Sequence, residues 1–83
     1  MKQINVAVPF KEGLHARPAS ELVKLCQGIN SKIILGKGEM KIDPKSILGI
    51  MSLGASYGDQ LTITVNGEDE EISTQKLEEF FAG

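Results

Sequence analysis

The chain has 83 residues, of which 41% are hydrophobic and 24% are charged, a balance typical of one small folded domain and unlike that of a disordered chain. Its formal net charge is -2, and its aromatic residues are one Tyr and three Phe, with no Trp. These values argue against general nucleic-acid binding, which depends on excess positive charge and on aromatic side chains that stack on bases.

The first predicted elements are a strand over residues 2–8 and a helix that begins at Ala16. Polar and apolar residues alternate over residues 2–8, which is typical of a half-buried strand. A polar loop follows over residues 9–13. From Ala16 the apolar residues recur at helical spacing until Gly28, which favours a helix end. Pro18 falls in the first turn, where its missing N–H costs little.

The middle of the chain predicts a β-hairpin followed by a short helix. Strands over residues 31–35 and 40–42 are separated by a tight turn at residues 36–39. Ser46 is a typical N-cap for an apolar helix over residues 47–53.

The last predicted elements are a strand over residues 61–65 and a C-terminal helix. The acidic run at residues 68–71 suits a helix N-terminus because of the helix dipole. The order β-α-β-β-α-β-α favours an α+β fold, an antiparallel sheet with helices on one face. The expected apolar face of the last helix is thin and consists of Leu77 and Phe81, helped by Ile72 or Phe80.

Cysteine content and hydropathy indicate the cellular setting that we expect. Cys26 is the only cysteine, so no disulfide or zinc cluster can form within the chain, and its place on the apolar side of a helix predicts a small buried residue. Residues 1–10 alternate in polarity and lack the continuous apolar core of a signal peptide. No apolar run reaches membrane-spanning length. We therefore expect a cytoplasmic protein that does not insert into membranes.

The chemistry of the chain centres on residues 13–19 (GLHARPA), which place the only histidine, His15, at a predicted helix start. The backbone N–H groups of Ala16 and Arg17 have no helical acceptor there, and the Arg17 guanidinium suits a phosphate. An imidazole nitrogen beside such groups is typical of a phosphoryl acceptor. A surface or capping histidine without chemistry is the alternative. A metal site is not expected, because one histidine lacks convergent ligands, and no cofactor is expected.

Two stretches carry a resemblance to a known family. Residues 13–19 are similar to the active-site signature of HPr, the histidine-containing phosphocarrier of the bacterial sugar phosphotransferase system, and residues 45–54 (KSILGIMSLG) resemble that family's regulatory serine signature. The similarity extends over essentially the whole chain. It implies one domain over residues 1–83 with an open-faced β-sandwich fold. In this fold a four-stranded antiparallel sheet in the order 1-4-2-3 has three helices on one face.

The resemblance also implies a function. His15 would accept a phosphoryl group on Nδ1 from phosphorylated enzyme I and pass it to sugar-specific IIA domains, with Arg17 and the N–H groups of Ala16 and Arg17 stabilising the phosphate. The chain would then be a relay protein and not a stand-alone enzyme. Independently of the resemblance, we expect a monomer by default.

Ser46 has a structural and a regulatory interpretation. Its position alone predicts only a helix cap, at which a phosphate would be tolerated. In Gram-positive relatives of the family, an ATP-dependent HPr kinase/phosphorylase phosphorylates this serine. That modification hinders transfer at the histidine and promotes binding to a catabolite-control transcription factor.

The short helix after Ser46 has two apolar sectors. At 100° per residue, Ile47, Leu48 and Met51 fall on one side, whereas Ile50 and Leu53 fall on another. A helix this short cannot readily bury both sides of a thin domain. We expect the first sector to be exposed and to bind partners, unless loops cover it.

Polar residues are expected to complete this surface. Lys24 and Lys45 could form a basic rim that steers acidic partners, and Ser20 would lie near the same rim; each is equally compatible with ordinary solvated surface.

Several residues depart from the family pattern, among them Glu12, Met40, Pro44 and Thr74. Glu12 is expected to repel an incoming phosphate unless its side chain points away, and Met40 and Pro44 to alter recognition by the kinase.

Two other function classes stay open. One is a purely regulatory HPr-like protein that acts through Ser46 and the apolar sector, with little histidine transfer. The other is an α+β module that binds RNA or a small ligand, which would need stacking aromatics or a cleft of convergent polar groups. The sequence offers neither feature.

Overall fold

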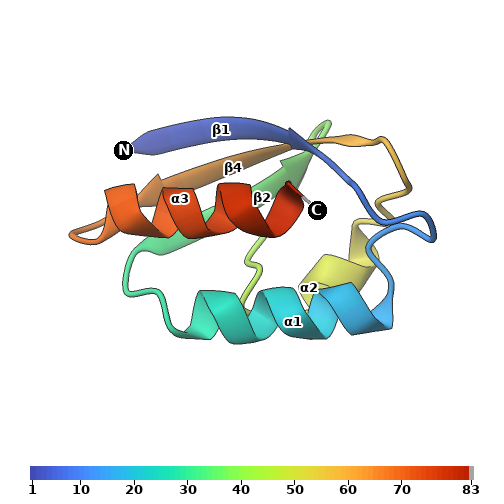
Figure 1. Cartoon of the computed structure of the whole chain (residues 1–83), viewed down its shortest axis with the longest axis horizontal. Helices are drawn as coiled ribbons and strands as arrows, with labels where there is room; N and C mark the ends of the chain where they lie inside the picture. Colours follow the sequence, from blue (N-terminus) through green and yellow to red (C-terminus); the bar gives the residue numbers. More distant parts are fainter. Residues whose placement is uncertain (83) are drawn as a thin grey trace.

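Four strands form one antiparallel sheet, and three helices lie on one of its faces (Figure 1). The structure, a computed structural model, describes residues 1–82; Gly83, the last residue of the predicted domain, lies outside the described residues. In chain order the elements are β1 (Lys2–Ala7), α1 (Ala16–Gln27), β2 (Lys32–Lys37), β3 (Met40–Ile42), α2 (Ile47–Ser52), β4 (Gln60–Asn66) and α3 (Glu70–Phe81).

The strand order is β1-β4-β2-β3, and every pair is antiparallel. The α+β class, the order of elements and the sheet order expected from the family resemblance are therefore confirmed. Strand β4 lies at the centre of the sheet, with Leu61 opposite Val6 of β1 and Ile63 opposite Leu35 of β2. Its inward residues are buried and alternate with half-buried threonines, because successive side chains of a strand point to opposite faces.

The helices and the inner face of the sheet enclose one hydrophobic core. Strand β1 contributes Val8 just beyond its end, and α1 contributes the fully buried Cys26, as its apolar side predicted. Burial raises the pKa of the Cys26 thiol to about 12, which keeps it protonated and unreactive.

The hairpin turn is tighter than the sequence indicated. Strand β2 continues through Gly36 to Lys37, so the predicted four-residue turn shrinks to Gly38 and Glu39. Gly38 has a φ of 60°, a positive value that the first residue of a type II′ turn requires. The glycine at position 36 therefore belongs to a strand, and the prediction placed the boundary at the wrong glycine.

The buried face of α3 contains the expected Leu77 and Phe81 with help from Phe80, and also two residues that the sequence did not indicate. Leu77 and Phe81 are buried and Phe80 is half-buried, but Ile72 is 53% exposed. The sector that contains Leu77 also contains the residues three and four positions before it, whereas Ile72 is rotated away. Those two residues are Ser73 and Thr74; both are buried, and the Thr74 hydroxyl donates to the Glu70 carbonyl at 2.6 Å.

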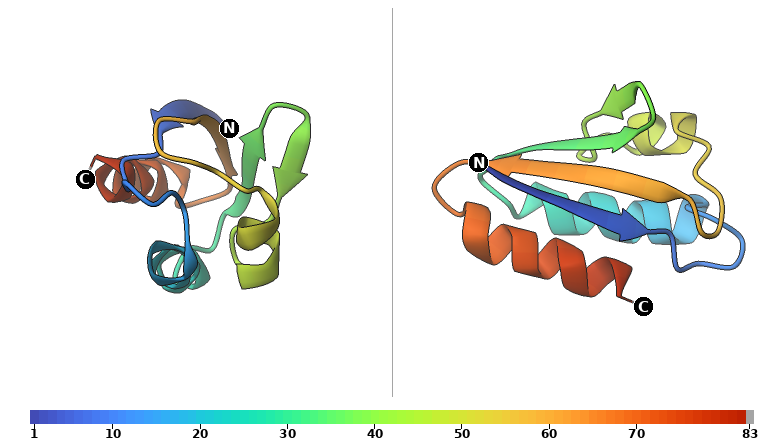
Figure 2. Two further views of the ribbon diagram at one scale, coloured as in Figure 1. Left: turned by 90° about the vertical axis from the view of Figure 1, so that its right-hand side faces the viewer. Right: turned by 90° about the horizontal axis from the view of Figure 1, so that it is seen from above.

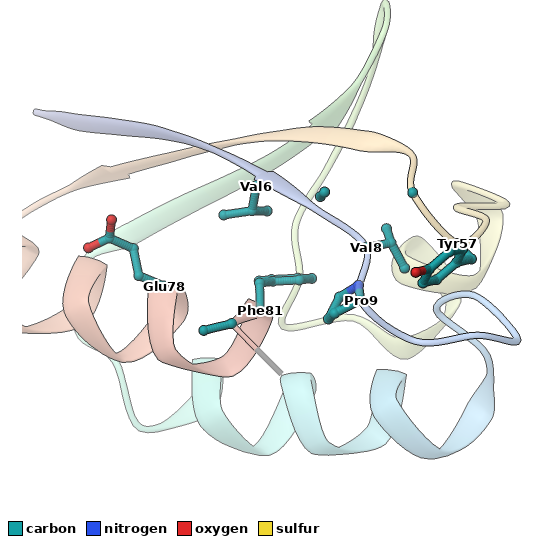
Figure 3. Close-up of a pocket in the computed structure, with 9 residues that line it drawn as sticks. Val6, Val8, Pro9, Tyr57, Glu78 and Phe81 are labelled. Carbon is teal, nitrogen blue, oxygen red and sulfur yellow. The ribbon is translucent and has the colours of Figure 1, made fainter.

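A cleft of about 500 Å³ opens between the end of β1, the turn before β4 and the last turn of α3 (Figure 3). Apolar side chains form most of its lining, with Tyr57 on one side and Glu78 on the other. Within residues 1–82, no helix combines the length and the hydropathy needed to cross a membrane.

Candidate functional site

The segment that leads into α1 is anchored on the segment that follows α2. After β1, the backbone turns so that Gly13 donates to the Phe10 carbonyl at 2.8 Å. The next N–H, that of Leu14, donates to the Ala55 carbonyl at 2.9 Å, and the Leu14 side chain is buried. These bonds bring the start of α1 beside the end of α2.

The close contact between the backbone at position 13 and that at position 55 requires a glycine at position 13. Its φ is 80°, and a Cβ atom added there would lie 2.6 Å from the Ala55 carbonyl oxygen, closer than real Cβ contacts allow. The sequence indicated an unusual turn at Gly13, but not the backbone that it approaches.

His15 is the N-cap residue of α1 and keeps its imidazole free. Its backbone is extended, and its carbonyl accepts from Ala19 at 2.9 Å. The side chain is exposed and makes no capping hydrogen bond. Because α1 begins at Ala16, the ring lies at the positive end of the helix dipole.

Two backbone donors next to His15 are unoccupied. Among the described residues, the N–H groups of Ala16 and Arg17 have no backbone or side-chain acceptor, and Pro18 has no N–H to satisfy. The Arg17 side chain is exposed. The structure therefore places the imidazole and two free N–H groups at one helix start, with the exposed Arg17 in the first turn. Such an arrangement can hold a phosphoryl group.

Ser46 is the N-cap of α2, as predicted. Its hydroxyl oxygen accepts from the Gly49 N–H at 3.1 Å, its carbonyl accepts from Ile50 at 3.1 Å, and the residue is exposed. Since α2 has six residues, Ser46 stands about 9 Å along the helix axis from its other end, the end nearest His15.

Helix α2 exposes one apolar sector and buries the other. Leu48 is 79% exposed, Met51 44% and Ile47 39%, whereas Ile50 and Leu53 are buried. The predicted division of the helix is confirmed, and the three exposed residues are called here the apolar patch. Helices α1 and α2 contact each other, and Figure 2 shows α2 alongside the N-terminal part of α1.

The three residues predicted to form the rim around the apolar patch differ in exposure and hydrogen bonding. Ser20 and Lys24 are exposed on α1. Lys45, however, is half-buried, and its ammonium donates to the Ile29 carbonyl at 2.9 Å just beyond the end of α1. The alternative of an ordinary solvated lysine does not fit Lys45, because a backbone carbonyl binds its charged end. Its part in a basic rim stays a prediction. Lys24 makes no ion pair within the described residues.

Glu12 is exposed and forms no ion pair with His15 or Arg17 in the described part of the chain. Its expected repulsion of an incoming phosphate stays a prediction. The cleft of Figure 3 has no residue in common with the predicted site, which is therefore formed on an exposed surface.

Two residues that the sequence did not point to hold the segment after α2. The Lys37 ammonium lies 3.1 Å from the Gly54 carbonyl, 3.5 Å from the Leu53 carbonyl and 3.1 Å from Asp59 Oδ2. The Ser56 N–H, which donates to Asp59 Oδ2 at 2.8 Å, and the ion pair with Lys37 together lower the pKa of the Asp59 carboxyl. No local pattern links a lysine and an aspartate so far apart in the chain.

The comparison with protein families gives one match over nearly the whole chain. The model of the family described as "PTS HPr component phosphorylation site" matches residues 2–83. Two similar proteins are the HPr-like protein Crh of Bacillus subtilis, 42% identical over 93% of this chain and 91% of its own length, and the phosphocarrier protein HPr of Treponema pallidum, 36% identical over 92% and 86%.

Solved structures agree with these matches. A crystal structure of HPr from Thermoanaerobacter tengcongensis is 38% identical, with a TM-score of 0.95 over 99% of this chain and 92% of that one. A crystal structure of the Bacillus subtilis catabolite repression protein Crh, described as a dimer with a swapped domain, is 39% identical, with a TM-score of 0.78 over 99% and 94%.

Proposed function

The chain belongs to the HPr family of phosphocarrier proteins, and we propose that it accepts a phosphoryl group on His15 from phosphorylated enzyme I and passes it to sugar-specific IIA domains. One observation carries this proposal. The exposed imidazole stands at a helix start whose first two N–H groups are unoccupied and whose N-cap side chain is not used for capping.

The chemical step needs little from the protein beyond position and charge. The lone pair of His15 Nδ1 forms a bond to phosphorus while the bond from phosphorus to the donor breaks. The negative oxygens of the phosphoryl group then accept from the N–H groups of Ala16 and Arg17 and from the Arg17 guanidinium. Transfer to a IIA domain is the same step in reverse, with the histidine as leaving group. Solvent exposure of these donors keeps them from binding the phosphate too tightly.

We assign partner recognition to the apolar patch and to Ser20 and Lys24 beside it. Exposed apolar clusters commonly mark interfaces, and methionine adapts to several partners. The patch lies on the helix that contacts α1, so a partner that covers it also reaches His15. These encounters would take place in the cytoplasm.

Ser46 is proposed as a regulatory site for an ATP-dependent HPr kinase/phosphorylase. Its exposed hydroxyl lies at a helix N-terminus that can stabilise a phosphate dianion. The length of α2 separates it from the His15 end. A phosphate on Ser46 would therefore act on the partner that covers the patch, by adding charge at its edge, and would promote binding to a catabolite-control transcription factor.

The second candidate is a regulatory protein with little histidine transfer. The similarity to Crh, described as a catabolite repression protein, favours it. Glu12, which could repel the phosphate, points the same way. The presence of both His15 and Arg17 favours the carrier, because a purely regulatory protein has no need for a phosphoryl acceptor. The swapped dimer described for Crh makes the oligomeric state a separate question; we propose a monomer, which sedimentation can test.

Labelling separates the two candidates. The protein is incubated with enzyme I and labelled phosphoenolpyruvate, and the label is tested for acid lability, with His15→Ala as the control. Acid-labile label on the wild type alone supports the carrier. A folded wild type that takes up none excludes it. In parallel, ATP and the HPr kinase should place an acid-stable label on the wild type and none on Ser46→Ala.

A further inference from the structure

Lys37 lies at the end of β2 and connects the hairpin to the end of α2. Its ammonium donates to the Gly54 carbonyl and is within 3.5 Å of the Leu53 carbonyl. A cation is favourable there because the C-terminal carbonyls of a helix carry partial negative charge. The last turn of α2 contains no basic residue of its own, so the hairpin supplies the charge.

The same ammonium pairs with Asp59, which fixes the segment between α2 and β4. Asp59 Oδ2 accepts from the Ser56 N–H at 2.8 Å and lies 3.1 Å from the Lys37 ammonium. Both backbone groups of Asp59 are hydrogen-bonded. Its N–H donates to the Ser56 carbonyl at 3.0 Å, and its carbonyl accepts from the Val8 N–H at 3.0 Å. The segment is thereby held from two sides.

The segment over residues 54–59 contacts the two residues that precede His15. Ala55, next to Ser56, accepts from Leu14, and Gly13 comes so close to Ala55 that no side chain fits. A short path of direct contacts therefore leads from Lys37 through residues 54–59 to the residue before His15.

We propose that Lys37 and Asp59 form a positioning pair, which sets the His15 segment and the apolar patch in one fixed arrangement for phosphoryl transfer. The proposal rests on the proposed carrier function. Neither residue touches the phosphate. The pair acts because a reacting group displaced by about 1 Å can lose a large part of its rate. The two halves of the site lie on separate helices, α1 and α2, and the segment that this pair holds follows α2 and contacts the residue before His15.

The test uses three variants and a matched control on the same hairpin. Lys37→Met keeps the length of the side chain without its charge, Asp59→Asn removes the partner charge, and the double variant combines them. Lys41→Met is the control, because Lys41 is exposed on the same hairpin and forms no ion pair within the described residues. Lys37→Arg tests rescue, since it restores a cation at the same place.

The first readout is the rate of histidine phosphorylation at saturating phosphorylated enzyme I, measured where circular dichroism shows every variant to be folded. We expect about a tenfold lower rate for Lys37→Met and for Asp59→Asn. The double variant should be no slower than either, because members of one pair are not additive. Lys41→Met should match the wild type, and Lys37→Arg should recover most of the rate. A folded Lys37→Met that transfers at the wild-type rate would overturn the proposal.

The second readout does not depend on transfer. The amide resonances of Ala16 and Arg17 should shift in Lys37→Met and stay in place in Lys41→Met. Unchanged amides in Lys37→Met would contradict the positioning role even if the rate falls. If the wild type takes no label, the carrier function fails, and the amide shifts still decide whether the pair positions this segment. If Lys37→Met does not fold, Asp59→Asn and Lys37→Arg supply the same comparison.

Discussion

The N-cap side chains of helices α1 and α3 are used in opposite ways, although neither makes a capping hydrogen bond. At the start of α1, the imidazole of the N-cap residue makes no capping bond and the next two N–H groups have no acceptor in the described chain. At the start of α3, the Asp69 carboxylate accepts from the N–H groups of Asn30 and Ser31, both at 2.9 Å, and from the Ser31 hydroxyl. The next residue, Glu70, accepts from the N-terminal amine at 3.0 Å.

The difference separates stability from function. Bonds at the start of α3 join the helix to the beginning of β2 and to the N-terminus, so they hold distant parts of the chain together. Unbonded N–H groups occur at both helix starts, because the Asp69 side chain makes no capping bond either, and water can satisfy them. What distinguishes α1 is its N-cap side chain, an exposed imidazole that makes no capping bond and is free to react.

The largest expected effect is a loss of labelling from a change at the start of α1 and a loss of thermal stability from a change at the start of α3. His15→Ala should abolish phosphoryl labelling and change the free energy of unfolding by no more than about 0.5 kcal/mol, because the side chain is exposed and unbonded. Asp69→Ala should clearly lower the melting temperature and leave labelling intact at temperatures where the protein is folded. Thermal denaturation and labelling of both variants check this pair of results.

The contrast between the two helix starts would be wrong if His15→Ala lost stability or Asp69→Ala lost labelling. A marked loss of stability in His15→Ala would mean that the imidazole has a structural role. Loss of labelling in a folded Asp69→Ala would mean that the two helix starts are coupled.

The approach to His15 gives the next largest effect. Gly13→Ala should lower the free energy of unfolding by about 2–4 kcal/mol, since it combines a positive φ with a clash against the Ala55 carbonyl. Gly38→Ala is the control, because its φ is also positive but its Cβ would enter open space, and we expect a cost of about 1 kcal/mol. Equal costs in urea denaturation would show that the contact with Ala55 is unimportant.

Acid should weaken the start of α3 and spare that of α1. Bonds from the Ser31 hydroxyl, and then from the N–H groups of Asn30 and Ser31, lower the pKa of Asp69 from 3.8 to about 2. A lowered carboxyl pKa adds stability that is complete above pH 3.8 and is lost as the pH falls towards 2. The free energy of unfolding should therefore fall less steeply between pH 4 and pH 2 in Asp69→Asn than in the wild type. Parallel slopes would remove Asp69 from the acid response.

Local patterns predicted most of the fold and the positions of the two candidate side chains, His15 and Ser46, at helix starts. Alternation identified β1 and β4, and the glycine-rich turn identified the hairpin of β2 and β3. The capping position of Ser46 is confirmed, and the spacing in α2 divided exposed from buried residues correctly. Each of these features depends on neighbours within a few residues. The error at the hairpin also has a local cause, because two glycines compete for one turn and only pairing with β4 decides between them.

What the sequence could not predict depends on contacts between distant residues. The bond from Lys45 to the Ile29 carbonyl and the ion pair of Lys37 with Asp59 each join residues that only the fold brings together. Solvated lysines and bonded lysines have the same sequence pattern. The unoccupied N–H groups next to His15 could be predicted, because they follow from the helix start itself. The hydrogen bond from Leu14 to the Ala55 carbonyl could not be predicted, because it joins residues far apart in the chain.

The start of α2 gives the smallest effect and combines the two kinds of helix start. Ser46 makes a capping bond, as a structural residue does, yet it is exposed, as a modifiable residue must be. Ser46→Ala should lower the free energy of unfolding by about 1 kcal/mol, and Ser46→Asp should restore it, because aspartate also caps and its charge suits the dipole. Ser56 is an exposed serine whose side chain makes no hydrogen bond within residues 1–82, so Ser56→Ala should change the free energy of unfolding by less than about 0.5 kcal/mol.

If Ser46→Asp is as stable as the wild type and is phosphorylated more slowly on His15, charge at this cap acts on the partner surface and not through loss of structure. If it is destabilised like Ser46→Ala, the cap tolerates no added charge, and Ser46 is structural in the way that Asp69 is.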